Sequence, residues 1–406
     1  MASTTATAAL RPVPDHVPPE LIHNIGLIES PEFLAAPHDY MAALHQRCPP
    51  IFWSTGTQSA GWNLIKHEDA FFMLRSVEYF TNEGGTPFPR DPENPFRLIP
   101  VEVNPPEHRK YRNILDPMLS PQGIGRLEGT IRKLANDLID EVIDQGECQF
   151  DEAYGRPLPV SIFLDLMGLP QAMRDTFVAW AVDLLHATDP AVSGKAYWAI
   201  CGYLETAIED KRRNPDEGAM SRIIRGEIDG QPLSPQDVFG FTVFLFIAGL
   251  DTVFATLNNM WLWLAQNPAK RHEIIARPQD IMAINEELLR RWGVTFSGRT
   301  LLKDLELRGV RMKAGDKVMS ILPACNFDPE VFPDPLAVDF DRVRKPILSF
   351  AGGVHSCMGA HLARLEIRIA LQEWLRRIPD FALKPGFKAE FRPGGVVGPE
   401  HVPLVW

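Results

Sequence analysis

The stretch "FAGGVHSCMG", residues 350–359, decides how the rest of the chain is interpreted. It places Cys357 in a glycine-rich loop directly before a predicted helix. Loop glycines allow backbone N–H groups to turn toward the sulfur, and a helix N-terminus stabilises negative charge nearby. Both effects favour the thiolate, the form of cysteine that ligates metals. The alternative reading is a free thiol packed in the core.

The pattern of cysteines narrows the kind of metal site. Five cysteines are spread widely and include no C-x-x-C pair, which argues against a zinc site and against a disulfide framework. A single thiolate suits an iron that is held mainly by a porphyrin, with cysteine as the axial ligand. The loop is therefore compatible with an iron site of this kind, and a buried structural thiol stays the alternative.

The composition indicates the general class of protein. The chain has 406 residues, a formal net charge of -11 and 45% hydrophobic residues, as an ordinary globular protein has. The acidic balance argues against nucleic acid as the main partner, and the scattered cysteines fit a reducing cytoplasm. Helical patterns dominate, and strand-like stretches are confined to the N-terminal region, residues 307–324 and the C-terminus. We expect one mainly helical domain over residues 1–406 with a smaller β-containing region, and a loose leader over residues 1–20.

The longest apolar segment, residues 238–268, is long enough to cross a bilayer. It carries Asp251 at its centre and has no cluster of positive charge at either end, so we predict a buried helix and no membrane span. Ser234 and Pro235 form a helix start, and Asn267 followed by proline marks the end.

The centre of this segment combines groups that could carry chemistry. Asp251 is the only formal charge within residues 238–269. A lone carboxylate in an apolar helix is costly unless it is paired or functional. Gly249 weakens the helix locally, and the Thr252 hydroxyl can donate back to the carbonyl of Ala248. The segment is either a kinked core helix with an ion-paired aspartate or a site of proton delivery.

Four residues of the opening stretch match a known loop. Phe350, Gly353, Cys357 and Gly359 fit the F-x-x-G-x-x-x-C-x-G haem loop, so the sequence resembles the cytochrome P450 family. The resemblance implies the fold of that family, in which a large helical region and a smaller β-containing region enclose haem b. It also implies that Cys357 is the axial ligand of the haem iron.

Two further matches to the family appear before this loop. Glu287 and Arg290 form an E-x-x-R element, although most such pairs one helical turn apart are surface salt bridges. Residues 326–344 resemble the meander of the family, and the resemblance implies that Arg342 joins Glu287 and Arg290 beneath the haem.

The resemblance also assigns roles around the haem. It implies that Asp251 and Thr252 deliver protons beside bound oxygen. It further implies that basic groups reach the haem propionates, each of which would otherwise be read as a surface charge. These basic groups are His108, Arg112, Arg299 and His355.

Within the family, the chain is most similar to the bacterial camphor 5-monooxygenase group, from "PPEHRKYR" (105–112) through "GLDTV" (249–253) to the terminal "PLVW" (403–406). That group holds the camphor ketone through a tyrosine hydroxyl, and the matching residue here is Phe96. Loss of the only directed donor argues against camphor as the natural substrate. We predict a small hydrophobic terpenoid or an ionone-like norisoprenoid. The expected pocket residues are Phe88, Phe96, Phe244, Ile247, Gly249, Thr295, Gly395 and Val396.

The predicted activity is insertion of one oxygen atom from O2 into a C–H bond of this substrate. The sequence contains no flavin or nucleotide-binding motif, so we expect electrons from an acidic [2Fe–2S] ferredoxin with its NAD(P)H-dependent reductase. The expected docking residues, which are otherwise read as scattered surface charge, are Arg109, Arg112, Lys345 and Arg364.

Three other functions remain as alternatives. A peroxide-driven haem peroxygenase usually replaces the acid–alcohol pair by other polar groups, and a haem-based sensor needs no such pair, so Asp251 and Thr252 disfavour both. A helical protein that binds apolar ligands would leave the Cys357 loop and its glycines unexplained.

Overall fold

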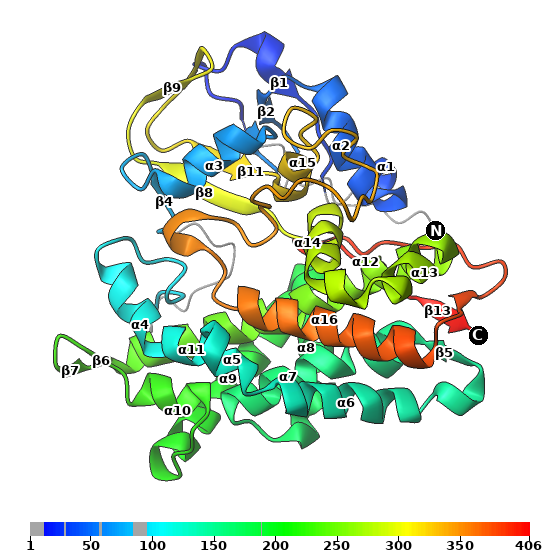
Figure 1. The fold of residues 1–406 in the computed structure, drawn as a ribbon. Coiled ribbons are helices and arrows are strands. Elements are labelled where there is room, and N and C mark those ends of the chain that lie inside the picture. Colours follow the sequence, from blue (N-terminus) through cyan, green and yellow to red (C-terminus); the bar gives the residue numbers. More distant parts are fainter. Residues whose placement is uncertain (1–11, 28–29, 57–58, 84–95, 188) are drawn as a thin grey trace, which may run out of the picture.

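Helices form the larger part of the fold, and a mixed sheet with short helices around it forms the smaller part (Figure 1). The protein is described from a computed structural model, which describes residues 12–27, 30–56, 59–83, 96–187 and 189–406. The predicted mainly helical fold with a smaller β region is confirmed.

The larger part consists of helices that pack against one another. Its helices are α4 (Glu107–Leu119), α5 (Pro121–Gly125), α6 (Glu128–Asp140), α7 (Pro157–Met167), α8 (Arg174–His186), α9 (Pro190–Arg213), α10 (Ala219–Ile224), α11 (Pro235–Leu250), α12 (Thr252–Gln266), α13 (Pro268–Ala276), α14 (Ile281–Arg291) and α16 (Ala360–Arg377). The smaller part adds α1 (Pro31–Ala35), α2 (Pro37–Arg47), α3 (His67–Arg75) and α15 (Leu322–Asn326).

The main sheet has the order β1-β2-β3-β11-β8-β4. Its strands are β1 (Ile22–His23), β2 (Ile51–Ser54), β3 (Gly61–Leu64), β11 (Lys317–Ser320), β8 (Ser297–Leu301) and β4 (Phe80–Thr81). The β1–β2 and β3–β11 pairs are parallel and the other pairs are antiparallel. Smaller sheets pair β9 (Leu305–Leu307) with β10 (Val310–Met312), β6 (Glu227–Ile228) with β7 (Gln231–Pro232), and β12 (Ala382–Leu383) with β13 (Pro403–Val405) and β5 (Glu147–Gln149).

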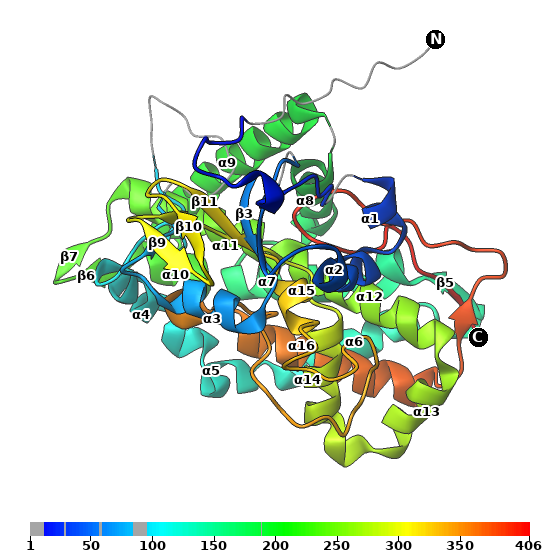
Figure 2. The ribbon, with the colours of Figure 1, turned by 90° about the horizontal axis from the view of Figure 1, so that it is seen from above.

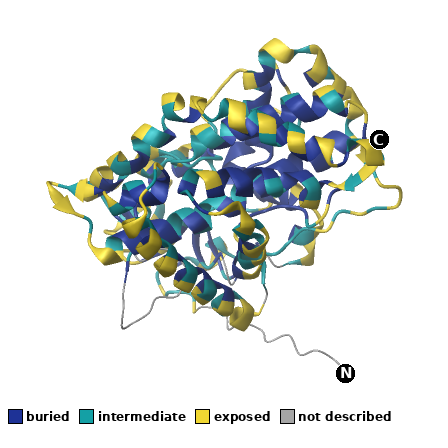
Figure 3. Ribbon diagram, turned by 90° about the horizontal axis from the view of Figure 1, so that it is seen from below, coloured by how far each residue is buried: buried dark blue, intermediate teal, exposed yellow. Residues whose placement is uncertain are grey.

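Buried residues gather in the interior of the protein and exposed residues on its outside (Figure 3), and most of the long apolar segment belongs to that interior. Among the described residues, one helical stretch, Pro235–Gln266, is long and apolar enough to cross a membrane, and 61% of its most apolar window is buried within the protein. The helix begins as predicted, because the Ser234 hydroxyl accepts from the Asp237 N–H at 3.1 Å. It is interrupted at Asp251, which separates α11 from α12.

The N-terminal segment differs from the expected loose leader. Residues 1–11 lie outside the described part of the chain. Residues 12–20 pack on the smaller part, where Val17 is buried in the core beneath the main sheet. The His16 Nε2 atom lies 2.8 Å from the Asp316 carboxylate. The prediction is therefore wrong for residues 12–20, because one apolar and one polar contact hold them.

A buried ion network joins α14 to the loop that follows α15. The Arg290 Nε and Nη2 atoms each donate to Glu287 at 2.8 Å, and Arg342 Nε donates to the same carboxylate at 3.1 Å. Arg290 also donates to the carbonyls of Asn326 and Pro335. Because α14 packs against both α15 and α16 (Figures 1 and 2), the network fixes the loop relative to both helices.

Replacement of Glu287 by Gln is expected to remove the negative charge and leave two buried guanidinium groups uncompensated. Breaking a buried ion pair in this way costs about 3–5 kcal/mol of unfolding free energy. Urea unfolding would measure the loss. The control is Glu306→Gln, which breaks an exposed pair with Arg311 and should change the midpoint little. Equal midpoints for both variants would contradict the structural role of the buried pair.

Candidate functional site

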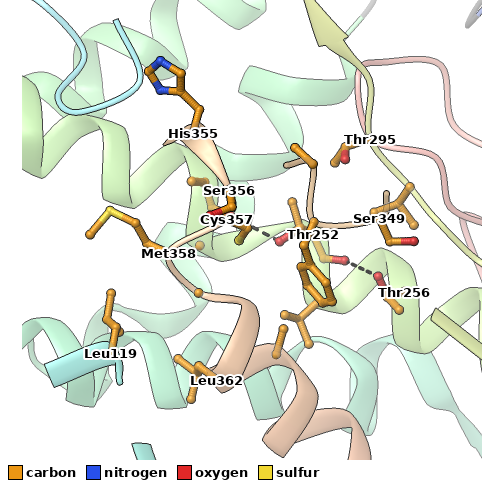
Figure 4. Close-up of a pocket in the computed structure, with 18 of the residues that line it drawn as sticks. Leu119, Thr252, Thr256, Thr295, Ser349, His355, Ser356, Cys357, Met358 and Leu362 are labelled. Carbon is orange, nitrogen blue, oxygen red and sulfur yellow. Dashed lines mark hydrogen bonds between the residues drawn. The ribbon is translucent and has the colours of Figure 1, made fainter. Parts of the chain in front are cut away.

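A cavity of about 330 Å³ lies among the loop before α16, the start of β8 and helices α4, α11, α12 and α16. Figure 4 shows Thr252 on its helix and Cys357 on the loop that leads into α16. Of the predicted site residues, the following ten line the cavity: His108, Arg112, Phe244, Gly249, Thr252, Thr295, Phe350, His355, Cys357 and Gly359. Residues from four separate parts of the sequence therefore meet here.

The loop that carries Cys357 has a backbone that requires glycine. Gly353 adopts φ 67°, and a Cβ atom there would lie 2.1 Å from the carbonyl oxygen of Leu74. The loop can therefore press against α3 only with glycine at this position. The Cys357 N–H donates to the Phe350 carbonyl at 3.0 Å, which turns the loop back on itself just before α16.

The sulfur of Cys357 faces the cavity while protein surrounds it on the other sides. Burial raises the pKa of the thiol, and this outweighs the opposing effects of the Gly359 and Ala360 N–H groups and of Arg112 and Arg364. The prediction that the loop favours the thiolate is therefore incomplete, because burial dominates. A metal ion bound to the sulfur would supply the missing stabilisation, since a coordinating thiol is deprotonated.

Three basic side chains line one edge of the cavity: His108, Arg112 and His355. Arg299 on β8 is not a lining residue but acts electrostatically on His355. It is buried, and burial lowers its pKa to about 10. Burial, then the charge of Arg299, then the neighbouring His108 lower the pKa of His355 to about 3. Burial and Arg112 lower the pKa of His108 to about 4, and the two imidazole rings lie 4.4 Å apart.

This edge fits an anionic group. Among the described residues no carboxylate pairs with Arg299, and the His108 Nε2 atom is buried without a hydrogen-bond partner. A buried cation and an orphaned ring nitrogen are stabilised when an anion binds between them. The propionates of haem b would supply that anion, and Cys357, which also lines the cavity, would supply the axial thiolate. The residues present therefore fit the group that the sequence implies.

The predicted acid–alcohol pair is divided between two sides of the helix. The Thr252 hydroxyl donates to the Ala248 carbonyl at 3.3 Å, as the sequence predicts, and Thr252 lines the cavity. Asp251 is buried but does not line the cavity. Its Oδ2 atom lies 2.9 Å from the Nε2 atom of His186, a residue that sequence reasoning missed. No local pattern marks His186, because it lies 65 residues away in the chain.

Only some of the predicted substrate-binding residues line the cavity. Phe244, Gly249 and Thr295 line the cavity, and Phe88 lies outside the described residues. Four others are not among the lining residues of the described cavity, and their role as pocket residues stays a prediction: Phe96, Ile247, Gly395 and Val396.

Two of these four have contacts that place them beside other residues. Phe96 packs edge-on to Phe239, with ring centroids 4.8 Å apart. Val396 forms a β-bridge with Thr295, which does line the cavity.

The predicted docking residues differ in whether an acidic side chain lies beside them and in how exposed they are. Arg364 pairs with Glu286 at 2.5 Å, and Arg112 pairs with Asp116 at 3.1 Å. Arg109 is exposed and lies 3.4 Å from the same aspartate. Lys345 is exposed, on the loop that leads to Cys357.

One buried carboxyl group on α16 also lines the cavity. Glu366 is 2% exposed, and its Oε2 atom has no hydrogen-bond partner. Burial raises its pKa well above the usual range of a glutamate. The sequence analysis did not single it out, because its spacing is that of an ordinary helix position.

Replacement of Glu366 by Gln is expected to stabilise the protein more as the pH rises. The raised pKa means that the wild type loses unfolding free energy above the ordinary carboxyl range near pH 4.5, by up to about 1.4 kcal/mol per pH unit, and Gln has no such loss. Urea unfolding of both proteins at about pH 5 and about pH 8 measures the difference.

Glu373 on the same helix is the matched control. Arg376, Asn136 and Arg132 bind its carboxylate and lower its pKa although burial opposes them. Glu373→Gln should therefore destabilise the protein above the ordinary carboxyl range. A pH-independent difference for Glu366→Gln would show that its carboxyl group is not held neutral.

Comparisons with known proteins identify the family of the chain. The model of the family described as Cytochrome P450 matches residues 281–386. "Probable cytochrome P450 127A1" of Sinorhizobium fredii is 32% identical over 97% of this chain and 97% of its own length. "Steroid C26-monooxygenase" of Mycolicibacterium smegmatis is 30% identical over 88% of this chain and 87% of its own length. The crystal structure of CYP101J2 superposes with a TM-score of 0.85 at 30% identity, covering 97% of this chain and 99% of that one. The chain belongs to the cytochrome P450 family of monooxygenases, whose cofactor is haem b with a thiolate ligand.

Proposed function

We propose that this monooxygenase hydroxylates a compact hydrocarbon-like guest, a terpenoid or an ionone-like norisoprenoid, with electrons from a [2Fe–2S] ferredoxin and its NAD(P)H-dependent reductase. The observation that carries the proposal is the single cavity shared by Cys357, Thr252 and Phe244. Haem-thiolate chemistry activates O2 for insertion into a C–H bond.

The residues at the basic edge and in the loop would hold the haem. Cys357 would be the axial ligand, in the loop framed by Phe350, Gly353 and Gly359. His108, Arg112, Arg299 and His355 would bind the propionates. The orphaned His108 nitrogen and the uncompensated Arg299 support this assignment.

Asp251 and Thr252 would supply protons from the helix break. Thr252 presents a hydroxyl to the cavity and holds it on the Ala248 carbonyl. Asp251 is the neighbouring residue and the only formal charge within residues 238–269. This acid–alcohol pair favours a monooxygenase over a peroxygenase or a sensor.

The size and lining of the cavity support a compact guest. Its volume of about 330 Å³ lies at the lower end of the range of ligand sites, about 300–1,000 Å³, and the haem shares it. Phe163, Phe244 and Val294 give the lining an apolar character. A steroid, the substrate in the name of the Mycolicibacterium relative, would need more room than a monoterpenoid.

A basic rim near Cys357 supports an acidic electron donor. Lys345 and Arg109 are exposed there on a chain whose net charge is -11. Complementary charge mainly speeds the encounter of two proteins. The five cysteines all lie in the described part of the chain and none forms a disulfide, which supports a reducing cytoplasm as the location.

Absorption spectroscopy of the haem-bound protein tests the proposal. The dithionite-reduced protein with carbon monoxide should show the strongly red-shifted Soret band of thiolate-ligated haem, and Cys357→Ser should lose it. β-Ionone should then shift the spin state of the ferric protein more than camphor or testosterone. A red-shifted band with preference for testosterone would overturn the substrate class alone, and a histidine-type band would overturn Cys357 as the ligand.

Reversal of charge at Lys345 tests the electron donor. Lys345→Glu should slow reduction by a [2Fe–2S] ferredoxin several-fold at low salt and have less effect at high salt, because salt screens exposed charges. Stopped-flow reduction under carbon monoxide measures the rate. Lys388→Glu, on the exposed loop between β12 and β13, is the control. Equal rates for both variants would contradict docking at this rim.

A further inference from the structure

Three side chains that can ligate a metal ion meet outside the cavity. Asp151 is the first residue of the short π-helix η3 (Asp151–Gly155), Glu152 follows it, and His401 lies 250 positions further along the chain. One donor atom from each of the three side chains lies within 4.8 Å of the others. None of the three lines the cavity that contains Cys357. They therefore form a separate cluster.

Backbone pairing brings the two segments together. Strand β13 pairs antiparallel with β5, and Leu404 lies opposite Cys148. The pairing continues into the Phe150 N–H, which donates to the Val402 carbonyl at 2.9 Å. Figures 1 and 2 show β5 and β13 at the edge of the protein where the C-terminus lies. The register of these strands sets His401 against Asp151, so the cluster is a product of the fold.

The carboxylate of Asp151 is buried and is held in one orientation. Its side chain is 1% exposed, and Oδ1 accepts from the Val402 N–H at 2.9 Å. Oδ2 lies 3.1 Å from Nδ1 of His401. Buried charges in proteins are paired or bind metal ions. When His401 is neutral, no cation lies at hydrogen-bonding distance from Asp151 in the described part of the chain.

The spacing of the donor atoms fits a tetrahedral metal ion. Zn²⁺ holds nitrogen and oxygen ligands at about 2.0–2.1 Å, which places two tetrahedral donors about 3.3 Å apart. The 3.1 Å between His401 Nδ1 and Asp151 Oδ2 is close to that separation. Glu152 is exposed, so its carboxylate can turn inward as the third ligand. The imidazole ring is 46% exposed, so its proton can move from Nδ1 to Nε2 and bond to solvent.

The surrounding charge favours a cation. Asp151 and Glu152 both act electrostatically on Arg156, whose guanidinium lies 4.5 Å from the ring centroid of Phe254. This single positive charge offsets only part of the negative charge of the two carboxylates. One imidazole with two carboxylates suits Zn²⁺ and neighbouring transition metals, whereas Ca²⁺ and Mg²⁺ prefer ligand sets made of oxygen alone.

We propose that Asp151, Glu152 and His401 bind one divalent transition-metal ion, with Zn²⁺ as its occupant, and that this ion clasps the C-terminal strand β13 to η3. In the binding step His401 shifts its proton from Nδ1 to Nε2, and a water molecule completes the tetrahedron. The inference goes beyond the proposed function and does not depend on it, because no member of the cluster lines the cavity.

Calorimetric titration of the holoenzyme with zinc chloride tests the site. The protein carries no affinity tag and is first treated with EDTA, and bound haem keeps the Cys357 thiol from binding zinc. We expect one ion per chain, and His401→Ala should weaken binding at least about tenfold, since even the partners of metal ligands contribute that much. Mg²⁺ should not bind at the same concentrations. Absence of zinc binding by the wild type, or equal affinity for Mg²⁺, would overturn the proposal.

His272→Ala is the matched control. This variant removes an exposed imidazole that lies 2.9 Å from the carboxylate of Asp380, in a pair that belongs to no three-donor group of the described residues. It should bind zinc as tightly as the wild type. Equal weakening in His272→Ala and His401→Ala would mean that zinc binds to surface histidines in general, and the proposed site would be wrong.

Glu152→Gln is the second variant and decides the matter if His401→Ala does not fold. Glu152 is exposed, so its replacement leaves the core intact. Glutamine keeps the size of the side chain but removes the charged ligand, and zinc binding should weaken several-fold. Unchanged affinity in Glu152→Gln would contradict a site with three protein ligands.

Hydrogen exchange tests the clasp itself. Exchange of backbone amides reports local opening of a segment. Zinc should slow exchange in peptides that cover residues 399–406 of the wild type, and it should have no such effect in His401→Ala. If zinc binds to the wild type and exchange in these peptides does not change, the ion does not hold β13 and this part of the proposal is wrong.

Discussion

One buried carboxylate, that of Glu287, anchors the long loop between α15 and Cys357. Glu287 accepts from Arg290 and Arg342, and these guanidinium groups in turn bind carbonyls between Asn326 and Ala337. Residues 327–352 form neither helix nor strand, so their backbone groups need partners of this kind. The same stretch runs directly into Cys357. A charge network whose members do not line the cavity therefore helps to hold the stretch that leads to Cys357.

The two sides of the cavity differ in charge. At one edge the cation of Arg299 has no acid among the described residues, while His108 and His355 stay neutral because burial lowers their pKa. On the α11 side, Phe244 and Gly249 present no charge at all. A flat cofactor with two carboxylates on one edge suits this division, since its acidic edge meets the cations and its face meets apolar side chains.

Local patterns predicted the elements that depend on neighbours in the sequence. The Ser234 cap, the Thr252 bond to Ala248 and the start of a helix just after Cys357 each involve residues within four positions. Even the Glu287 network was foreseen, although through resemblance and not through spacing. These features need no knowledge of how distant segments pack.

Contacts between distant segments could not be predicted from the sequence. His186 reaches Asp251 only because the end of α8 packs beside the break in the apolar helix. Phe96 packs against Phe239 and is not among the residues that line the described cavity. Consecutive helix positions point about 100° apart, so an acid next to an alcohol sends one group out and the other in. Here Thr252 faces the cavity and Asp251 faces away, and the hydrophobic helix can therefore carry a charge without exposing the guest to it.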